Sequence, residues 1–162
     1  MEMMSEWVRA MIRDGARGTG SHADVVKAVS GLSLDAVMAR PGGVKHNIWQ
    51  NLWHAVFWQR TVFERYGAEE GKYPKIKLGV EDFPQADAPA SQEAWDALLR
   101  EFTAGVEETE RLASEADLSA PLAGWDGITL GYGLHMLGLH AGYHIGQIAQ
   151  TRMALNLWPP PT

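Results

Sequence analysis

Residues 129–155 read TLGYGLHMLGLHAGYHIGQIAQTRMAL, and this stretch decides the fold. At about 100° per residue, one stripe of it repeats at spacings of three and four, the seam pattern of a helical bundle. That stripe consists of Gly133, Leu137, His140, His144, Gln147 and Thr151. The opposite side carries small and aliphatic residues suited to close helix packing, namely Gly138, Gly142, Ile145 and Ala149. Because Arg152 is the only charged residue, we predict a helix with no side that faces water.

This helix places polar side chains inside the protein, where unpaired polar groups are costly. His140 and His144, at i and i+4, converge because successive helical turns stack their side chains. Neutral imidazole is the commonest metal ligand, so one bound cation can satisfy both rings. The pattern alone fits a surface pair equally well, and the missing polar face favours the ligand interpretation. Gln147 lies on the same stripe and can orient a ligand or hold a substrate, although a plain buried hydrogen bond explains it equally well.

A second buried helix is predicted over residues 45–66, which include HNIWQNLWHAVFWQR at positions 46–60. His54 lies in its middle, with apolar and aromatic neighbours on almost every side. By itself, His54 is best explained as a core histidine that hydrogen-bonds a neighbour, and the tryptophans around it as core packing. Beside a buried histidine pair on another helix, a shared metal ion is the simpler account. Three protein ligands leave a coordination position open for water or substrate, which is typical of a reactive site.

The other histidines are weaker candidates for the site. His135 precedes His140 by five residues, which turns it away from the stripe. His46 starts the second long helix, where it can cap the helix or line an entrance, and His22 follows a loop and is expected to be solvated.

Shorter helical pieces are predicted for the N-terminal part of the chain. One helix covers residues 3–12 and breaks around Asp14 and Gly15 and at the glycines of 18–20. The helix resumes after Ser21, whose hydroxyl can cap the new turn, while Asp24 favours the helix N-terminus. Gly31 ends that piece, and residues 41–43 form a loop.

A third long helix is predicted to begin at Ser91, a good N-cap residue. Charged residues occupy one face of it, and its buried stripe contains Trp95, Leu98, Leu99, Phe102, Val106 and Leu112. The segment before it contains Pro74, Pro84 and Pro89 and shows only a weak strand pattern at 75–80. Because this link is long enough to cross a bundle, we predict one all-α domain over residues 1–162. It is a four-helix bundle with a long crossover between its second and third helices.

Composition excludes several classes of function. The chain has 162 residues and no cysteine, so a metal must use nitrogen or oxygen ligands, and a cysteine nucleophile is excluded. The formal net charge is −6 and the basic residues are scattered, which argues against nucleic-acid binding. No apolar run reaches the length of a membrane span, and the N-terminus lacks a signal-peptide core. We therefore expect a cytoplasmic protein that binds neither nucleic acid nor membrane.

Two of these segments together resemble a known family. The stretch HAGYHIGQI at 140–148, followed by Arg152, Leu155 and residues 158–160, is similar to the C-terminal signature of DinB-like proteins. The stretch HNIWQNLWH at 46–54, which runs into Phe57, resembles the helix-two signature of the same superfamily. The two motifs occur in the expected order, on either side of a long crossover and an amphipathic third helix.

The resemblance implies an up-down-down-up four-helix bundle, usually a homodimer, with a divalent-metal site. The three histidine ligands of that site map onto His54, His140 and His144. Zinc, nickel and manganese all occur in such proteins. Characterised relatives include thiol-dependent S-transferases and a mycothiol-dependent isomerase, which use the metal to activate a low-molecular-weight thiol as co-substrate. The family name refers to induction by DNA damage and implies no contact with DNA.

Three hypotheses about function follow. The first is a metalloenzyme that acts on a small molecule, either by S-transfer from a thiol or by hydrolysis, with Gln147 in support of the ligands. The second is a non-catalytic bundle that the metal stabilises, acting as a stress-associated binding or interaction module. The third is a metal-free bundle whose histidines line a pocket for an organic ligand.

Overall fold

A computed structural model describes residues 2–69, 71, 73 and 75–160 of the chain. Pro74 and Pro161, which belong to the predicted crossover and C-terminal segment, lie outside the described residues. The elements in chain order are α1 (Glu2–Arg17), α2 (Val25–Val29), α3 (Leu34–Met38), the 3-10 turn η1 (Pro41–Gly43), α4 (Ile48–Arg65), α5 (Gln92–Glu115) and α6 (Leu130–Ala154). No strand occurs in the part that the structure describes, where only two isolated β-bridges are found.

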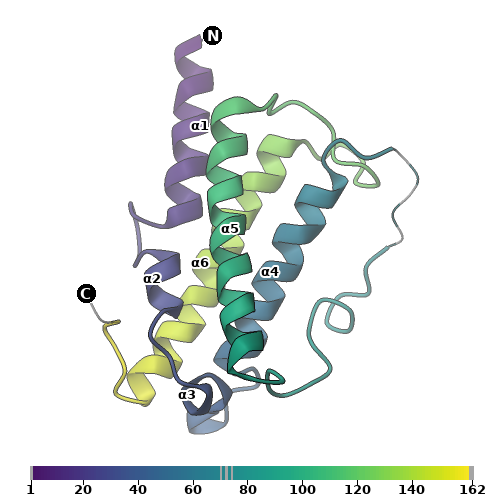
Figure 1. Ribbon diagram of the computed structural model, residues 1–162. Coiled ribbons are helices and arrows are strands. Elements are labelled where there is room, and N and C mark those ends of the chain that lie inside the picture. Colours follow the sequence, from purple (N-terminus) through teal and green to yellow (C-terminus); the bar gives the residue numbers. More distant parts are fainter. Residues whose placement is uncertain (1, 70, 72, 74, 161–162) are drawn as a thin grey trace.

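Four long helices pack as a bundle, which confirms the predicted fold class (Figure 1). Each of α1 and α4 packs against both α5 and α6, so α5 and α6 occupy diagonal corners. The pair α1 and α6 runs in one direction and the pair α4 and α5 in the other, which is the up-down-down-up order (Figure 1). Because α4 and α5 are parallel, the segment that joins them must travel the length of the bundle. Figure 1 shows this crossover on the outer side of α4.

The long helices begin at the capping residues that their sequences offer. The side chain of Asn47 accepts a hydrogen bond from the Gln50 backbone N–H, and the Gln50 side chain accepts one from the Asn47 backbone, forming a capping box. Ser91 caps α5, as predicted, and Thr129 caps α6. At the other end of α5, the Arg9 guanidinium of α1 donates to the carbonyls of Ala113 and Ala116. These carbonyls have no partner within the helix, so Arg9 completes the α5 terminus.

Helix α1 is longer than predicted. It continues through Asp14 and Gly15 to Arg17, and the break falls at Gly18, where φ is +81°. Gly15 lies against Gly138 of α6, where a Cβ on Gly138 would approach the Gly15 carbonyl carbon to 2.8 Å. The absence of a side chain on Gly138 lets the two helices approach closely, whereas a Cβ on Gly15 would meet nothing within 4 Å. The packing gained there offsets the cost of glycine in a helix, about 1 kcal/mol relative to alanine.

Two details between α1 and α4 differ from the prediction. Asp24, and not Ser21, caps α2, because its carboxylate accepts from the backbone N–H groups of Val26 and Lys27. A short helix that was not predicted, α3, begins after Ser33, whose hydroxyl accepts a hydrogen bond from the Ala36 backbone N–H. A single helical turn is too short to show a hydrophobic period, so only its cap could have revealed it.

Helix α6 has one exposed side, which contradicts the prediction of a helix buried all around. The exposed residues recur every three or four positions and carry no charge: Tyr132, His135, Met136, Leu139, Tyr143, Gly146, Gln150, Met153 and Ala154. A corner helix of a bundle contacts only its neighbours and presents its remaining side outward. Helix α6 therefore does contact solvent, but its outer side does so with uncharged residues.

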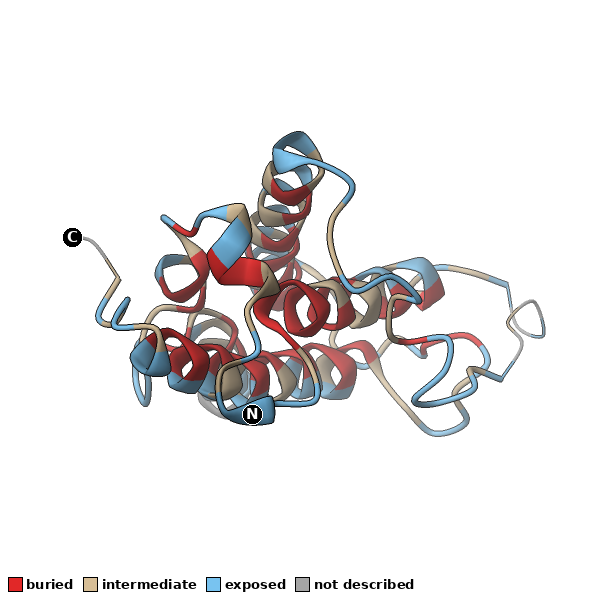
Figure 2. Cartoon of the chain, turned by 90° about the horizontal axis from the view of Figure 1, so that it is seen from below, coloured by how far each residue is buried: buried red, intermediate tan, exposed pale blue. Residues whose placement is uncertain are grey.

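The core consists of two hydrophobic clusters stacked along the bundle. Figure 2 shows the buried residues on the sides of the helices that face one another. On α6, His140 stands between Leu137 of one cluster and Ala141 of the other. The histidine pair therefore lies where the two clusters meet. None of the described helices has the length and apolar character needed to cross a lipid bilayer.

Candidate metal centre

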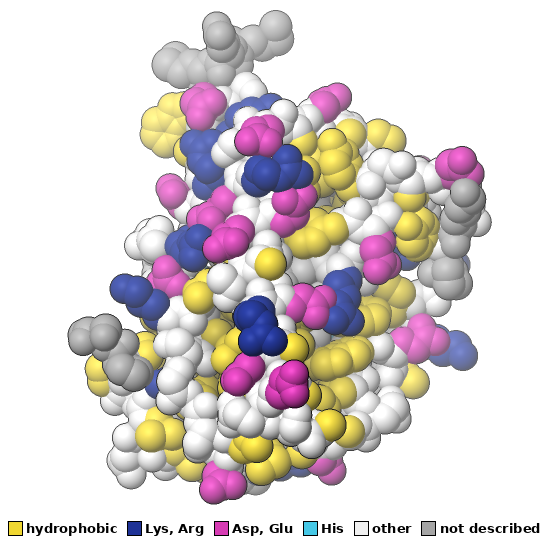
Figure 3. All heavy atoms as spheres, viewed as in Figure 1, with side chains coloured by type: hydrophobic (Ala, Val, Ile, Leu, Met, Phe, Trp, Pro, Cys, Tyr) yellow, Lys and Arg dark blue, Asp and Glu magenta, His cyan; other side chains and the backbone are white. Residues whose placement is uncertain are grey.

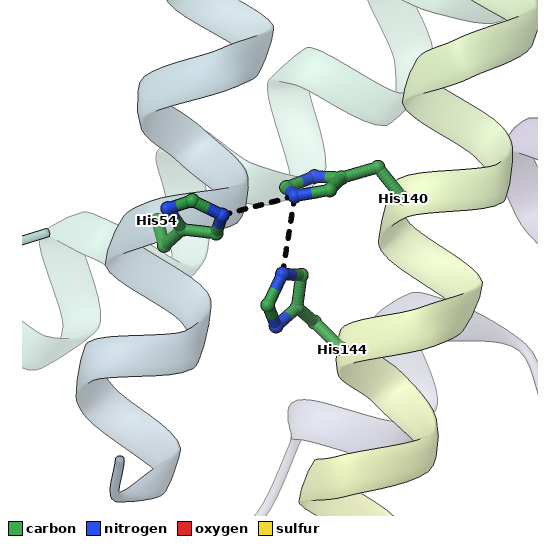
Figure 4. A group of neighbouring side chains, drawn as sticks. All are labelled: His54, His140 and His144. Carbon is green, nitrogen blue, oxygen red and sulfur yellow. Dashed lines mark hydrogen bonds between the residues drawn. The ribbon is translucent and has the colours of Figure 1, made fainter. Parts of the chain in front are cut away.

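The structure brings together the three histidines that the sequence predicted as ligands. His54 projects from the middle of α4, and His140 and His144 project from successive turns of α6 (Figure 4). Nε2 of His140 lies 3.0 Å from Nε2 of His54 and 3.1 Å from Nε2 of His144. His54 and His144 are buried and His140 is half-buried. The three Nε2 atoms thus converge on one point between two helices.

The hydrogen bond on the far side of His54 fixes where its proton resides. Nδ1 of His54 lies 2.6 Å from the main-chain carbonyl oxygen of Asp82, which can only accept, so Nδ1 donates. The Asp82 carboxylate is buried, lies 3.7 Å from the same Nδ1, and accepts from the Gly79 backbone N–H. With the proton on Nδ1, Nε2 of a neutral His54 presents a lone pair to the cluster.

His144 is held in the same orientation by two amides. Its Nδ1 donates to the Gln147 side-chain oxygen at 2.8 Å and faces the Asn51 side-chain oxygen at 3.2 Å. Gln147 therefore orients His144, which is one of the roles proposed for it from the sequence. Partners of this kind on the outer nitrogen commonly fix the ring orientation of metal-binding histidines.

The cluster fits a cation better than it fits hydrogen bonds among its own rings. Nε2 of His54 and Nε2 of His144 both present lone pairs, and a single proton on Nε2 of His140 can serve only one of them well. A shared metal ion accepts all three lone pairs. Two nitrogens that bind one ion tetrahedrally at about 2.0–2.1 Å lie about 3.3 Å apart. Two of the spacings in this cluster, 3.0 and 3.1 Å, are close to that value, and all three ligand atoms lie within 4.8 Å of one another.

The electrostatic surroundings keep the three rings neutral. Burial, together with the neighbouring His144 and His54, lowers the pKa of His140 to about 3. Burial and His54 lower the pKa of His144 to about 4, against the hydrogen bond to Gln147. Burial also lowers the pKa of His54, with the Asp82 carbonyl and carboxylate opposing it. At neutral pH each histidine is therefore in the form that binds a metal ion.

Aromatic rings from the crossover and α4 surround the cluster. The Phe83 ring stacks on His54, with the ring centroids 4.0 Å apart, and on its other side stacks on His46 at 4.2 Å. Trp58, one turn after His54, meets the edges of both His54 and His140. Trp58 was interpreted from the sequence as core packing, and it does pack against one of the two core clusters. It is only partly buried, however, and also forms a wall of the site.

No sequence pattern pointed to Asp82 and Phe83 as residues of the site. They lie in the crossover, where no helical or strand period fixes which residue meets His54. Asn51 could have been found, because it precedes His54 by three residues and so shares its side of α4. The remaining histidines stay outside the cluster, as expected: His22 and His135 are exposed, and His46 stacks on Phe83 behind the site.

Comparison with known proteins identifies one family. The family model described as the DinB superfamily matches residues 19–148, which is most of the chain. The match includes all three clustered histidines. No curated protein and no solved structure matches the chain.

Proposed function

The chain belongs to the DinB superfamily, and on that premise we propose that His54, His140 and His144 bind one divalent metal ion for a reaction on a small molecule. The observation that carries the proposal is the convergence of three neutral Nε2 atoms, two of them with lone pairs fixed by hydrogen bonds behind them. Zinc, nickel and manganese are the candidate ions, and three imidazole ligands suit zinc and nickel better than manganese, which prefers oxygen ligands.

A metal ion held by three neutral imidazoles keeps its full positive charge and lowers the pKa of a thiol or water that reaches it. We propose thiol-dependent S-transfer as the reaction and hydrolysis as the second candidate. In S-transfer the thiol loses its proton to solvent and its sulfur bonds to an electrophilic carbon, while the leaving group departs with the electrons of the broken bond. The chain itself contributes orientation: Asp82 holds His54, and Gln147 holds His144.

Metal content of purified protein tests the site. We expect one divalent ion per chain in the wild type and near-complete loss in His54→Ala, His140→Ala and His144→Ala, measured by elemental analysis. His135→Ala is the matched control, because His135 lies on the same helix as two of the ligands but is exposed outside the cluster. Metal retained by all three ligand variants would refute the site.

Turnover tests the reaction. Metal-loaded wild type is offered a panel of low-molecular-weight thiols with electrophiles, and separately a panel of esters and amides. We expect product only with metal present, and only in proteins that retain the three histidines. A protein that binds metal stoichiometrically but turns over nothing in either panel would support the alternative, a non-catalytic bundle in which the metal joins α4 to α6 and stabilises the fold.

We further propose that the chain forms a homodimer through the outer sides of α1 and α6. Exposed apolar side chains lie on both helices, Trp7 and Met11 on α1 and Leu139 and Tyr143 on α6, and Met11 and Leu139 line one common cavity. Burying such a surface against a second copy removes apolar area from water. Analytical ultracentrifugation should give a dimer for the wild type and a monomer for Leu139→Lys. A monomeric wild type at high concentration would refute the homodimer.

A further inference from the structure

A cavity of about 280 Å³ lies beside the histidine cluster, between α4, α6 and the segment that leads into α6. Trp58 and Trp125 form one wall, with their ring centroids 6.2 Å apart. Leu137 lies at the buried side, while Tyr132 and Met136 are exposed on the outer side and mark the mouth. His140 is the one titratable imidazole among the lining residues.

His140 and Trp58 connect this cavity to the candidate metal centre. The His140 ring lines the cavity, and its Nε2 faces the other two histidines. Trp58 lines the cavity and meets the edges of both His140 and His54. A molecule in the cavity therefore lies against the one ligand ring that is only half-buried. The reacting atom of such a molecule is within reach of the cluster.

The lining determines what the cavity can accept. Apart from the ring of His140 and the outer edge of Tyr132, its side chains are hydrocarbon, indole and thioether groups. A charged group placed there would lose its hydration without gaining a partner. A dry apolar cavity of about 150 Å³ accommodates benzene, so the larger cavity here has room for two fused aromatic rings. Indole walls favour flat ligands, because stacked and edge-on ring contacts add to the burial of apolar area.

We propose that this cavity is the pocket for the apolar, uncharged part of the substrate, a flat group of one or two fused rings or an aliphatic group of equal size. Its role in a reaction rests on the proposed function of the histidine cluster, but binding of the apolar group does not require the metal ion. Substrates that carry a charge on the part that enters the cavity are correspondingly disfavoured.

Two probes of equal size and different charge test the pocket, 2-naphthylmethanol and 2-naphthoate. The full chain is used after chelation, so that no bound metal attracts the carboxylate. Isothermal titration should show affinity for the neutral probe that is about tenfold or more above that for the anion. In NMR spectra, the neutral probe should shift the imidazole resonances of His140 and leave those of His22 unchanged.

Met136→Trp and Met153→Trp form a matched pair for the mutational test. Both methionines lie on α6, they are 42% and 45% exposed, and only Met136 lines the cavity. We expect Met136→Trp to weaken the neutral probe by about tenfold or more and Met153→Trp to change it by less than about twofold, since only the former fills the mouth.

Three results would overturn the pocket: equal affinity for the two probes, equal affinity in the two variants, or a bound probe that leaves His140 unshifted. The wild-type titration and spectra decide the matter even if a variant fails to fold. If the wild type binds no metal ion, the proposed function is refuted. The pocket is tested separately, by the two naphthyl probes alone.

Discussion

Helices α5 and α6 have 24 and 25 residues and occupy diagonal corners of the same bundle, yet they meet water in opposite ways. Helix α5 covers its outer side with ion pairs, such as Arg111 with Glu108 and Glu115 along the helix and Glu110 with Arg17 of α1. Figure 3 shows acidic and basic side chains gathered over the face on which α5 lies. Helix α6 exposes tyrosine, methionine and leucine, and its single charged residue, Arg152, is buried.

Under the two proposals above, only the outer side of α6 serves a ligand or a partner. Exposed ion pairs contribute about 0–1 kcal/mol each, so the outer side of α5 mainly keeps that surface solvated. The outer side of α6 has no charged residue that would keep it solvated in this way. Instead, Tyr132 and Met136 form the mouth of the apolar cavity, and Leu139 and Tyr143 lie on the proposed dimer surface. The four predictions below test this contrast, beginning with the largest expected effect.

The largest effect is expected at the buried arginine of α6. Nη1 of Arg152 donates to the carbonyls of Ala28 and Ser30, and Nε donates to the carbonyl of Leu157. Arg152→Ala leaves these acceptors without their donor and opens a cavity, so the free energy of unfolding should fall by about 3 kcal/mol. Arg100→Ala on the exposed side of α5 is the control and should change it by less than about 0.5 kcal/mol. If urea denaturation shows equal losses for Arg152→Ala and Arg100→Ala, the contrast between α5 and α6 is wrong.

The next largest effect should come from acid, which should weaken the contribution of α6 to stability at a higher pH than that of α5. The pKa values of His140 and His144 are lowered to about 3 and about 4, whereas an unfolded histidine has a pKa of about 6.5. The unfolded chain therefore takes up protons first, and the free energy of unfolding of the metal-free protein should fall as pH drops from about 6.5 towards 4. The pKa of Glu108 on α5 is lowered by its hydrogen bond to Arg111, so its contribution is lost only below the ordinary value of 4.5.

Urea denaturation at pH 7, 6 and 5 in the presence of chelator measures this dependence. His140→Ala should make the slope between pH 6.5 and 5 shallower, since one of the titrating groups is removed, and Glu108→Gln should leave it unchanged. A wild-type stability that is flat over this range would show that the cluster does not hold its histidines neutral.

Close packing provides the third prediction. A Cβ on Gly138 of α6 would meet the backbone of Gly15 at 2.8 Å, whereas a Cβ on Gly105 of α5 would meet the end of the flexible Gln59 side chain. Backbone yields less than a side chain, so Gly138→Ala should cost about 1–2 kcal/mol and Gly105→Ala clearly less. Thermal unfolding of the two variants gives the comparison. A larger loss at Gly105 would show that α1 and α6 adjust more easily than their contact suggests.

The smallest effect should be a gain. Gly146 lies within α6, is exposed, and has nothing within 4 Å of an added Cβ. Gly146→Ala should therefore raise the free energy of unfolding by about 0.5–1 kcal/mol, because alanine is the better helix former. It also shows whether a loss in Gly138→Ala comes from the contact with Gly15, since the same substitution is made in the same helix. A destabilised Gly146→Ala would indicate that this position is covered by a partner.

The contrast between these helices also explains what could be predicted from sequence. Helix α5 alternates buried and charged residues with a helical period, so its start at Ser91 and its buried stripe followed directly from Trp95 and Phe102. Helix α6 was predicted with nearly correct bounds. Which of its sides faces solvent was not predicted, because apolar residues occur on both its inner and its outer side. His140 and His144 were identified as a pair from their spacing, and His54 was added by resemblance to the DinB signature.

The parts of the site that were missed depend on long-range contacts. Asp82 and Phe83 come from the crossover, and their contact with His54 depends on the path of a loop over α4. Trp125 comes from the connection between α5 and α6, which has no period either. Local propensity and periodicity describe a helix and its sides, but they carry no information on which loop residue reaches which side chain.

The buried Arg152 has a consequence for how this chain can change over evolutionary time. Each of its acceptors is a main-chain carbonyl, at Ala28, Ser30 and Leu157. A carbonyl is supplied by every amino acid, so drift at positions 30 and 157 leaves the anchor intact provided that the backbone keeps its course. The arginine itself has no such freedom, because two of its nitrogens, Nε and Nη1, reach the three carbonyls, whereas lysine carries all its donors on one nitrogen. Position 152 is thus constrained by these hydrogen bonds, while the side chains at positions 30 and 157 are not.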